Sequence, residues 1–155
     1  EDMITTYKPN LEDLWFREKL MADEETMSYN PGGTIPFPRE RWAKWYSKWI
    51  DAPENERYYR YLYDTEAKEF VGEIAYRYDE ETKTHICDVI VLTEYRNRGY
   101  GTAGIRLICN AAKENGISHL YDDIASGNPS VKLFLKNGFE VEYENDEVTM
   151  VKKAL

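Results

Sequence analysis

The sequence predicts a single α/β domain with a mixed, mainly antiparallel sheet flanked by helices. Three strand-like segments, at residues 57–63, 69–78 and 84–92, are separated by short polar connections, as in an antiparallel meander. The third leads through a glycine-containing loop into a helical pattern at residues 100–115. Because hairpin-connected strands, not strand–helix–strand repeats, precede this unit, a doubly wound parallel sheet is disfavoured. We expect one domain over residues 3–153, which suits a length of 155 residues.

The segment before the meander predicts one strand and two helices. Residues 3–8 suit a short strand, and Pro9-Asn10 separates them from a helix over residues 11–22. Asp23 is placed to cap a short turn, and residues 30–38 form a loop rich in proline and glycine. From Arg39 a second helix places Trp42, Trp45, Tyr46 and Trp49 on one stripe. The stripe packs against the sheet or lines a groove, and packing is the ordinary use of such a face.

The C-terminal part predicts a helix on the sheet followed by further strands. In the 100–115 helix, Ile105, Ile108, Cys109 and Ala112 share one face, and Asn115-Gly116 ends the pattern. A strand at residues 119–125 and a helix at residues 130–137 follow. The chain then returns as a pair of strands at residues 139–144 and 147–153.

Composition excludes several classes of function. A formal charge of −9 argues against general nucleic-acid binding and is compatible with a cationic substrate. Cys87 and Cys109 lie in apolar segments without partners at metal-ligand spacing, so we expect buried thiols and no metal. The absence of an 18-residue apolar run argues against a membrane span, and we expect a cytoplasmic protein.

The loop between the 84–92 strand and the following helix carries two arginines and two glycines. Arg96 and Arg98 precede Gly99-Tyr100-Gly101 at the predicted helix N-terminus. The first N–H groups of a helix lack internal partners and carry the positive end of its dipole, and glycine lets an anion approach them. The segment therefore predicts a diphosphate cradle, the alternative being a tight turn that only packs the helix.

Two kinds of diphosphate ligand fit this loop. Residues 99–104 spell G-x-G-x-x-G, and Asp122 and Asp123 follow at the distance that a dinucleotide-binding oxidoreductase requires. However, six residues separate the strand from Gly99, whereas the dinucleotide motif begins directly after its strand. This alternative is the weaker one.

The second interpretation rests on a resemblance. Residues 96–101, RNRGYG, fit the pattern R/Q-x-x-G-x-G/A, and the chain resembles the GNAT superfamily of N-acetyltransferases, which bind acyl-CoA through this loop. Asn128-Pro129-Ser130 and the segment KLFLKNGF at residues 132–139 resemble the late segment of that family, so the likeness extends over roughly residues 70–150. It implies acetyl-CoA as the acyl donor, with cofactor contacts at Ile90, Val91, Leu92, Arg96, Asn97, Arg98, Gly99, Tyr100, Gly101, Thr102, Asn128 and Phe134.

The resemblance also implies the reaction, which is direct transfer of the acetyl group to a primary amine in a ternary complex. We expect the acceptor to be a small-molecule amine such as a polyamine, or a protein N-terminus, and the resemblance implies that the loop and one edge of the helix at residues 30–49 shape its site. A homodimer is compatible with the resemblance, whereas nucleic-acid and membrane partners are not expected.

An amine must lose a proton before it attacks, so a carboxylate near the loop strand is the expected base. Glu73, which follows Gly72 on the neighbouring strand, is the first candidate, although it can equally be a strand carboxylate without a catalytic role. Asp123 and Asp88 are the alternatives. Since Asp122 and Asp123 alternate along one strand, we expect only one of them to face the cleft.

Phe134 departs from the family pattern. Many members carry a tyrosine at this position, where the phenol protonates the departing thiolate, and phenylalanine has no proton to give. Tyr100, Tyr143 or water could take this role. Alternatively, the chain is a non-catalytic sensor of acyl-CoA.

Overall fold

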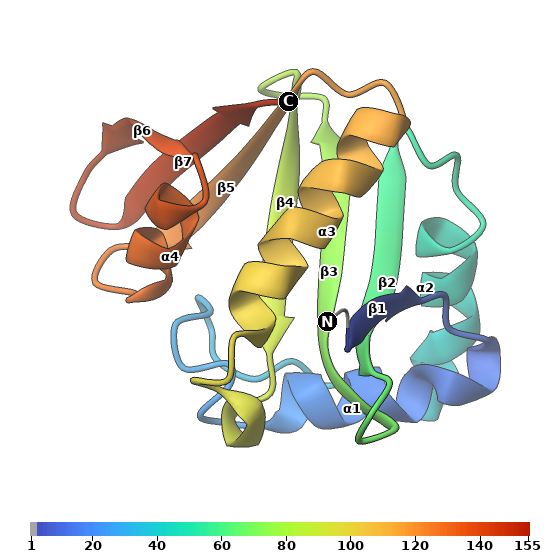
Figure 1. Ribbon diagram of the computed structural model, residues 1–155. Coiled ribbons are helices and arrows are strands. Elements are labelled where there is room, and N and C mark those ends of the chain that lie inside the picture. The colour runs from blue at the N-terminus through green and yellow to red at the C-terminus, as the bar shows by residue number, and fades with distance from the viewer. Residues whose placement is uncertain (1–2) are drawn as a thin grey trace.

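The computed structural model describes residues 3–155 and contains a seven-stranded sheet in the order β1-β2-β3-β4-β5-β7-β6 (Figure 1). The strands are β1 (Ile4–Tyr7), β2 (Arg57–Asp64), β3 (Glu69–Asp79), β4 (Thr84–Val91), β5 (His119–Ala125), β6 (Glu140–Glu144) and β7 (Val148–Ala154). The helices are α1 (Trp15–Ala22), α2 (Trp42–Trp49), α3 (Tyr100–Glu114) and α4 (Ser130–Lys136), and short 3₁₀ turns occupy η1 (Leu11–Leu14), η2 (Arg39–Arg41) and η3 (Thr93–Tyr95).

Strand pairing is antiparallel throughout except between β4 and β5. Strands β1 to β4 form a meander, and β7 inserts between β5 and β6. Helix α3 is the crossover that parallel pairing of β4 with β5 requires. This confirms the predicted mixed, mainly antiparallel sheet flanked by helices, and each predicted element is present within a few residues of its expected bounds.

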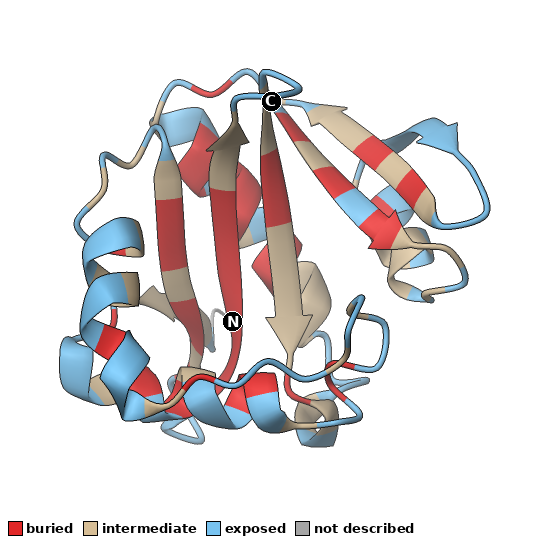
Figure 2. Ribbon diagram, turned by 180° about the vertical axis from the view of Figure 1, so that it is seen from behind, coloured by how far each residue is buried: buried red, intermediate tan, exposed pale blue. Residues whose placement is uncertain are grey.

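The two parallel strands diverge. Within residues 3–155, β4 pairs with β5 at one position, Ile86 with Tyr121. From there the strands separate towards the C-terminal end of β4, as both views of the ribbon show (Figures 1 and 2). The separation leaves one side of β4 without a strand partner, next to the loop that leads into α3.

Two apolar cores cover the two faces of the sheet. On one face, Ile105, Ile108 and Ala112 of α3 pack against Ile74 and Cys87, so the predicted apolar stripe of this helix is buried. On the other face, α1 and α2 pack against a second cluster, which includes Phe16, Leu20, Tyr59, Tyr61 and Ala75 (Figure 2).

In the tryptophan stripe of α2, Trp45 and Trp49 pack against Tyr59 of the sheet, whereas Trp42 packs with Leu14 and Phe37 in a separate cluster. Trp42 is buried, and the Trp45 ring meets the Tyr59 ring edge-on at a centroid distance of 4.7 Å. Cys87 and Cys109 are free and buried, as expected. Among the described residues, no helix is both long and apolar enough to cross a bilayer.

Candidate active site

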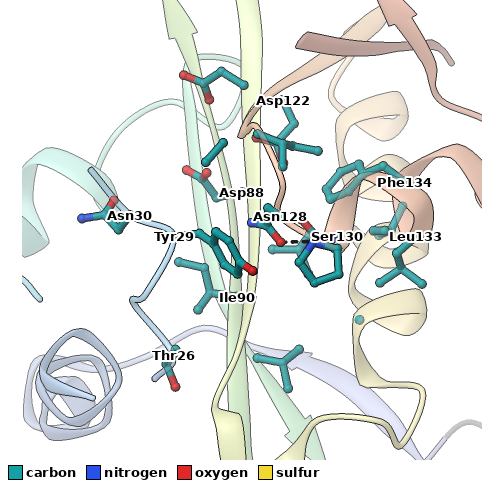
Figure 3. A pocket seen from close by; sticks show the side chains of 18 of the residues that line it. Thr26, Tyr29, Asn30, Asp88, Ile90, Asp122, Asn128, Ser130, Leu133 and Phe134 are labelled. Atoms are coloured by element: carbon teal, nitrogen blue, oxygen red, sulfur yellow. Dashed lines mark hydrogen bonds between the residues drawn. The ribbon is translucent and has the colours of Figure 1, made fainter. Parts of the chain in front are cut away.

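A cleft of about 820 Å³ occupies the space between the diverging strands β4 and β5. Apart from Arg77 of β3, its walls come from three regions of the sequence that folding brings together (Figure 3). The segment after α1 contributes Thr26, Met27, Tyr29, Asn30 and Pro31. Strand β4 and the start of α3 contribute Asp88, Val89, Ile90, Val91, Tyr95, Arg96, Asn97, Tyr100, Gly101 and Ile105, and the C-terminal part contributes Asp122, Asp123, Asn128, Ser130, Leu133, Phe134, Tyr143, Glu147 and Met150.

Alternation along β4 divides the cleft into two sides. Val89 and Val91 pack with the α3 core, whereas Ile90 packs with the core beneath α1 and α2. Asp88 therefore shares the α1 side with Ile90. On that side the wall is the segment 26–31, and on the other side it is formed by α3 and α4 (Figure 3).

The main-chain N–H and C=O groups of β4 also alternate in direction from one residue to the next. Leu92 donates its N–H to the Val71 carbonyl of β3 at 2.9 Å. Since successive residues direct their N–H and C=O groups to opposite edges of a strand, the main-chain groups of Val91 point away from β3 and towards the gap. The same rule turns the main-chain groups of Ile90 and Leu92 towards β3.

The loop before α3 has an open surface at the helix N-terminus. Gly99 is the N-cap residue, with a φ of 85°, and no side chain caps the helix. This left-handed conformation favours glycine. A Cβ at Gly99 would meet no atom within 4 Å, so there is open space beside the residue that begins α3.

The predicted cofactor residues divide into two groups. Those that line the cleft are Ile90, Val91, Arg96, Asn97, Tyr100, Gly101, Asn128 and Phe134, whereas Leu92, Arg98, Gly99 and Thr102 do not. Leu92 is buried in the core beneath α1, and the Arg98 guanidinium lies over the Tyr95 ring. Asn128 has a local role, because its side-chain oxygen accepts the Ser130 N–H at 2.9 Å before α4 (Figure 3).

Glu73 lies outside the cleft lining. Its buried carboxylate faces α1, where it accepts hydrogen bonds from the Arg17 guanidinium at 2.8 Å and from the Tyr59 hydroxyl. Arg17 in turn lies against the rings of Phe37 and Trp45. The sequence places Glu73 on the strand beside β4, but the partner that occupies its carboxylate is 56 residues away and is not evident from local pattern.

We expect Glu73→Gln to lower stability rather than turnover. The substitution leaves the buried Arg17 charge without its counterion, and losing one partner of a buried pair costs on the order of 3 kcal/mol. Urea denaturation measures the loss, and turnover per folded molecule should be retained. As a control, the double variant Arg17→Met/Glu73→Leu should be closer to wild type in stability than the single variant, because no unpaired charge remains. A fall in turnover with unchanged stability would instead restore Glu73 as the base.

Three carboxylates meet on the floor of the cleft. The side-chain oxygens of Asp88, Asp122 and Asp123 lie within 4.8 Å of one another. Asp88 and Asp122 approach from β4 and β5 respectively (Figure 3). Such a cluster can hold a cation or an ammonium group, since like charges at this distance favour a bound proton or positive partner.

The expectation that only one of Asp122 and Asp123 faces the cleft is wrong, because both line it. Alternation holds along β5, but β5 has moved away from β4, and the gap between the strands admits side chains from both of its faces. Both aspartates therefore lie close to Asp88.

The surroundings of the aspartates alter their protonation. Burial, followed by the charge of Asp123 and then that of Glu73, raises the pKa of Asp88 to about 7, and Arg77 and Arg17 oppose the shift. Burial and the charges of Asp88 and Asp123 likewise raise the pKa of Asp122 well above its usual range. Asp88 is thus poised to exchange a proton near neutral pH.

Sequence reasoning missed several residues of the cleft. Asn30 falls in the predicted loop and Tyr29 in no predicted element, and Arg77, Leu133 and Met150 carry no signal beyond strand or helix character. The sequence offered Asp88 only as an alternative base. The signal that pointed to it was its position on the strand that leads into the loop.

Comparison with known proteins identifies the family. The model of the acetyltransferase (GNAT) family matches residues 17–139. The chain belongs to the GNAT family. Among solved structures, a spermidine N-acetyltransferase from Vibrio cholerae, in complex with CoA and spermine, has a TM-score of 0.80 at 19% identity, covering 99% of this chain and 96% of that one.

Two further acetyltransferase structures are similar over nearly their full length. The PaiA N-acetyltransferase from Thermoplasma acidophilum, in complex with coenzyme A, has a TM-score of 0.72 at 17% identity, with coverage of 98% and 99%. An acetyltransferase of the GNAT family from Bacillus anthracis has a TM-score of 0.75 at 18% identity, with coverage of 99% and 94%. No curated protein matches the sequence. The GNAT fold does not accommodate the dinucleotide-binding alternative, which requires a doubly wound sheet.

Proposed function

We propose that this GNAT protein transfers the acetyl group of acetyl-CoA directly to a primary amine in a ternary complex. The proposal rests on one observation. The same cleft contains an uncapped helix N-terminus behind a glycine loop and a carboxylate with a pKa of about 7. The first supplies an anion site, and the second supplies a base suited to neutral pH.

The residues present fit acetyl-CoA. The N–H groups at the start of α3, beside Gly99, would hold the diphosphate, with Arg96 and Arg98 near by. The main chain of Val91 would hydrogen-bond to the acyl-pantetheine arm along the unpaired edge of β4, where its N–H can also polarise the acyl carbonyl. When bound, the cofactor supplies the thioester that the amine attacks.

Asp88 is the proposed base. A primary alkylamine is protonated at neutral pH, with a pKa of about 10.4 in lysine, so a proton must leave before the nitrogen attacks. Asp88 accepts this proton, directly or through water, while the charge of the neighbouring Asp123 holds the amine close. Glu73 is engaged by Arg17 and Tyr59 and is assigned a structural role.

The proton for the departing thiolate has two proposed sources, Tyr143 and water. Phe134 lines the cleft but has no proton to give. The Tyr100 hydroxyl donates to Asp64 at 2.6 Å, and this hydrogen bond raises the pKa of Tyr100. Tyr143 lines the cleft and is exposed to solvent.

The proposed acceptor is a cationic small-molecule amine of the polyamine type. Three clustered aspartates at the floor, Glu147 on the cleft wall and a net charge of −9 all favour a positively charged substrate. The similar Vibrio cholerae enzyme is a spermidine N-acetyltransferase. A protein N-terminus is the second candidate acceptor.

An amine panel tests the proposed function. Purified protein is incubated with acetyl-CoA and spermidine, spermine, a monoamine or a peptide with a free N-terminus, and thiol release and acetylated product are both measured. We expect equal amounts of the two products, with the polyamines as the best acceptors. Acetyl-CoA binding without transfer to any of these amines would contradict the proposal and support the sensor, which the phenylalanine at position 134 favours.

A further inference from the structure

A buried threonine joins the acceptor wall of the cleft to the loop that leads into α3. Thr26, 8% exposed, lies in the turn after α1, and its hydroxyl accepts the Thr93 N–H at 2.9 Å and lies 3.1 Å from the Thr93 hydroxyl. Arg96 donates to the main-chain carbonyl of Thr26 at 3.2 Å. The two segments are about 70 residues apart in sequence but are tied by side chains at both ends of η3.

Asp23 fixes the orientation of this threonine. Its carboxylate accepts the Thr26 N–H at 3.0 Å and the Thr26 hydroxyl proton. These hydrogen bonds lower the pKa of Asp23, so the carboxylate stays ionised at neutral pH. With its proton committed to Asp23, the Thr26 oxygen is available as an acceptor for Thr93.

The segments on the two sides of this contact belong to different proposed ligand sites. Met27, Tyr29, Asn30 and Pro31 follow Thr26 and form the α1-side wall of the cleft, where the amine is proposed to bind. Thr93 and Arg96 lead into the proposed diphosphate cradle. Most of residues 28–36 are exposed, so their conformation depends strongly on how the ends of the segment are anchored.

We propose that Thr26 is a positioning residue that couples the two substrate sites. A diphosphate on the loop narrows the range of conformations of residues 93–99, and the Thr26 contacts pass this ordering to residues 27–31. Cofactor binding therefore preorganises the acceptor wall, and by linkage a bound amine favours the cofactor to the same degree. The inference rests on the proposed function, because it assumes that CoA occupies the cradle.

The chain contains a matched control for this contact. Asp79 and Thr82 form the same Asp-x-x-Thr turn, in which the Asp79 carboxylate accepts the Thr82 N–H at 3.0 Å and the Thr82 hydroxyl at 2.6 Å. This turn is exposed, lies between β3 and β4, and is outside the cleft lining. Thr82→Val thus removes the same type of hydrogen bond without touching either substrate site.

Hydrogen exchange with CoA as the probe tests the coupling without requiring the identity of the amine. In wild type, saturating CoA should slow exchange in residues 27–34, where Asn30 and Gly33 donate main-chain hydrogen bonds, by about tenfold. Thr26→Val should still bind CoA but lose this protection. Thr26→Ser, which keeps the hydroxyl, and Thr82→Val should behave as wild type.

Each contrary outcome overturns a distinct statement. Protection that survives in Thr26→Val would show that CoA covers residues 27–34 directly, and it would overturn the role of Thr26. CoA binding to wild type without any change in exchange would overturn the coupling but leave the proposed function standing. If wild type does not bind CoA at all, the proposed function fails and this inference fails with it.

Discussion

Replacing Asp88 by asparagine should lower kcat/KM for the amine by about 100-fold, the usual contribution of a positioned base. Asparagine keeps the shape of the side chain but cannot accept a proton. In wild type, kcat/KM should rise with pH through an apparent pKa near 7, because Asp88 must be ionised to act. Since Asp88, Asp122 and Asp123 interact, this apparent pKa belongs to the cluster. In Asp88→Asn the rise near pH 7 should be absent, and calorimetric affinity for CoA should be unchanged.

The same substitution has an effect on stability with a defined sign. The folded state raises the pKa of Asp88 above its unfolded value, so the folded protein binds the extra proton. The resulting stabilisation is complete below the unfolded pKa, about 3.9, and is lost as the pH rises through about 7. Urea midpoints at pH 8 should therefore be higher for Asp88→Asn than for wild type.

If Asp88→Asn keeps wild-type activity and the same pH profile of kcat/KM, Asp88 is ruled out as the base and Asp123 becomes the next candidate.

Replacing Gly99 by aspartate should weaken CoA binding by about tenfold or more, because a like charge a few ångströms from a diphosphate costs on the order of 1–2 kcal/mol. Asparagine is the matched control. Asparagine has nearly the same shape as aspartate, and both tolerate the left-handed conformation that Gly99 adopts. Either side chain would enter open space, because a Cβ at this position meets no atom within 4 Å. Calorimetric titration with CoA measures the difference between the two variants.

A difference in stability between the two variants should not explain their difference in CoA affinity. An aspartate at the N-terminus of α3 interacts favourably with the helix dipole, so the melting temperature of Gly99→Asp should equal or exceed that of Gly99→Asn. Equal affinity of the two variants for CoA would contradict the placement of the diphosphate at this helix end.

Local sequence pattern was sufficient for most of the fold. Strand-like segments joined by short polar connections over residues 57–92 predicted the meander, and the spacing of Ile105, Ile108 and Ala112 predicted the buried face of α3. Turn-forming residues at 64–68 and 79–83 fixed the hairpins. These features depend on interactions between residues close in sequence, which is why they could be predicted.

The arrangement of the site depends on contacts between distant residues, and there the sequence was a weaker guide. The α1 residue Arg17 occupies the carboxylate of Glu73, and no periodicity reports this pairing. The separation of β4 from β5 lets both Asp122 and Asp123 line the cleft, which alternation on a closed sheet would forbid. The Thr26 contact with Thr93 likewise appears only when the α1 segment is folded against the loop.

The most direct test of the account is the initial-rate pattern when acetyl-CoA and the best amine of the panel are varied together. Direct transfer in one cleft predicts acetylated amine as the product and double-reciprocal lines that intersect, because both substrates must be bound before either product leaves. Parallel lines, which indicate a covalent acetyl-enzyme, would contradict direct attack.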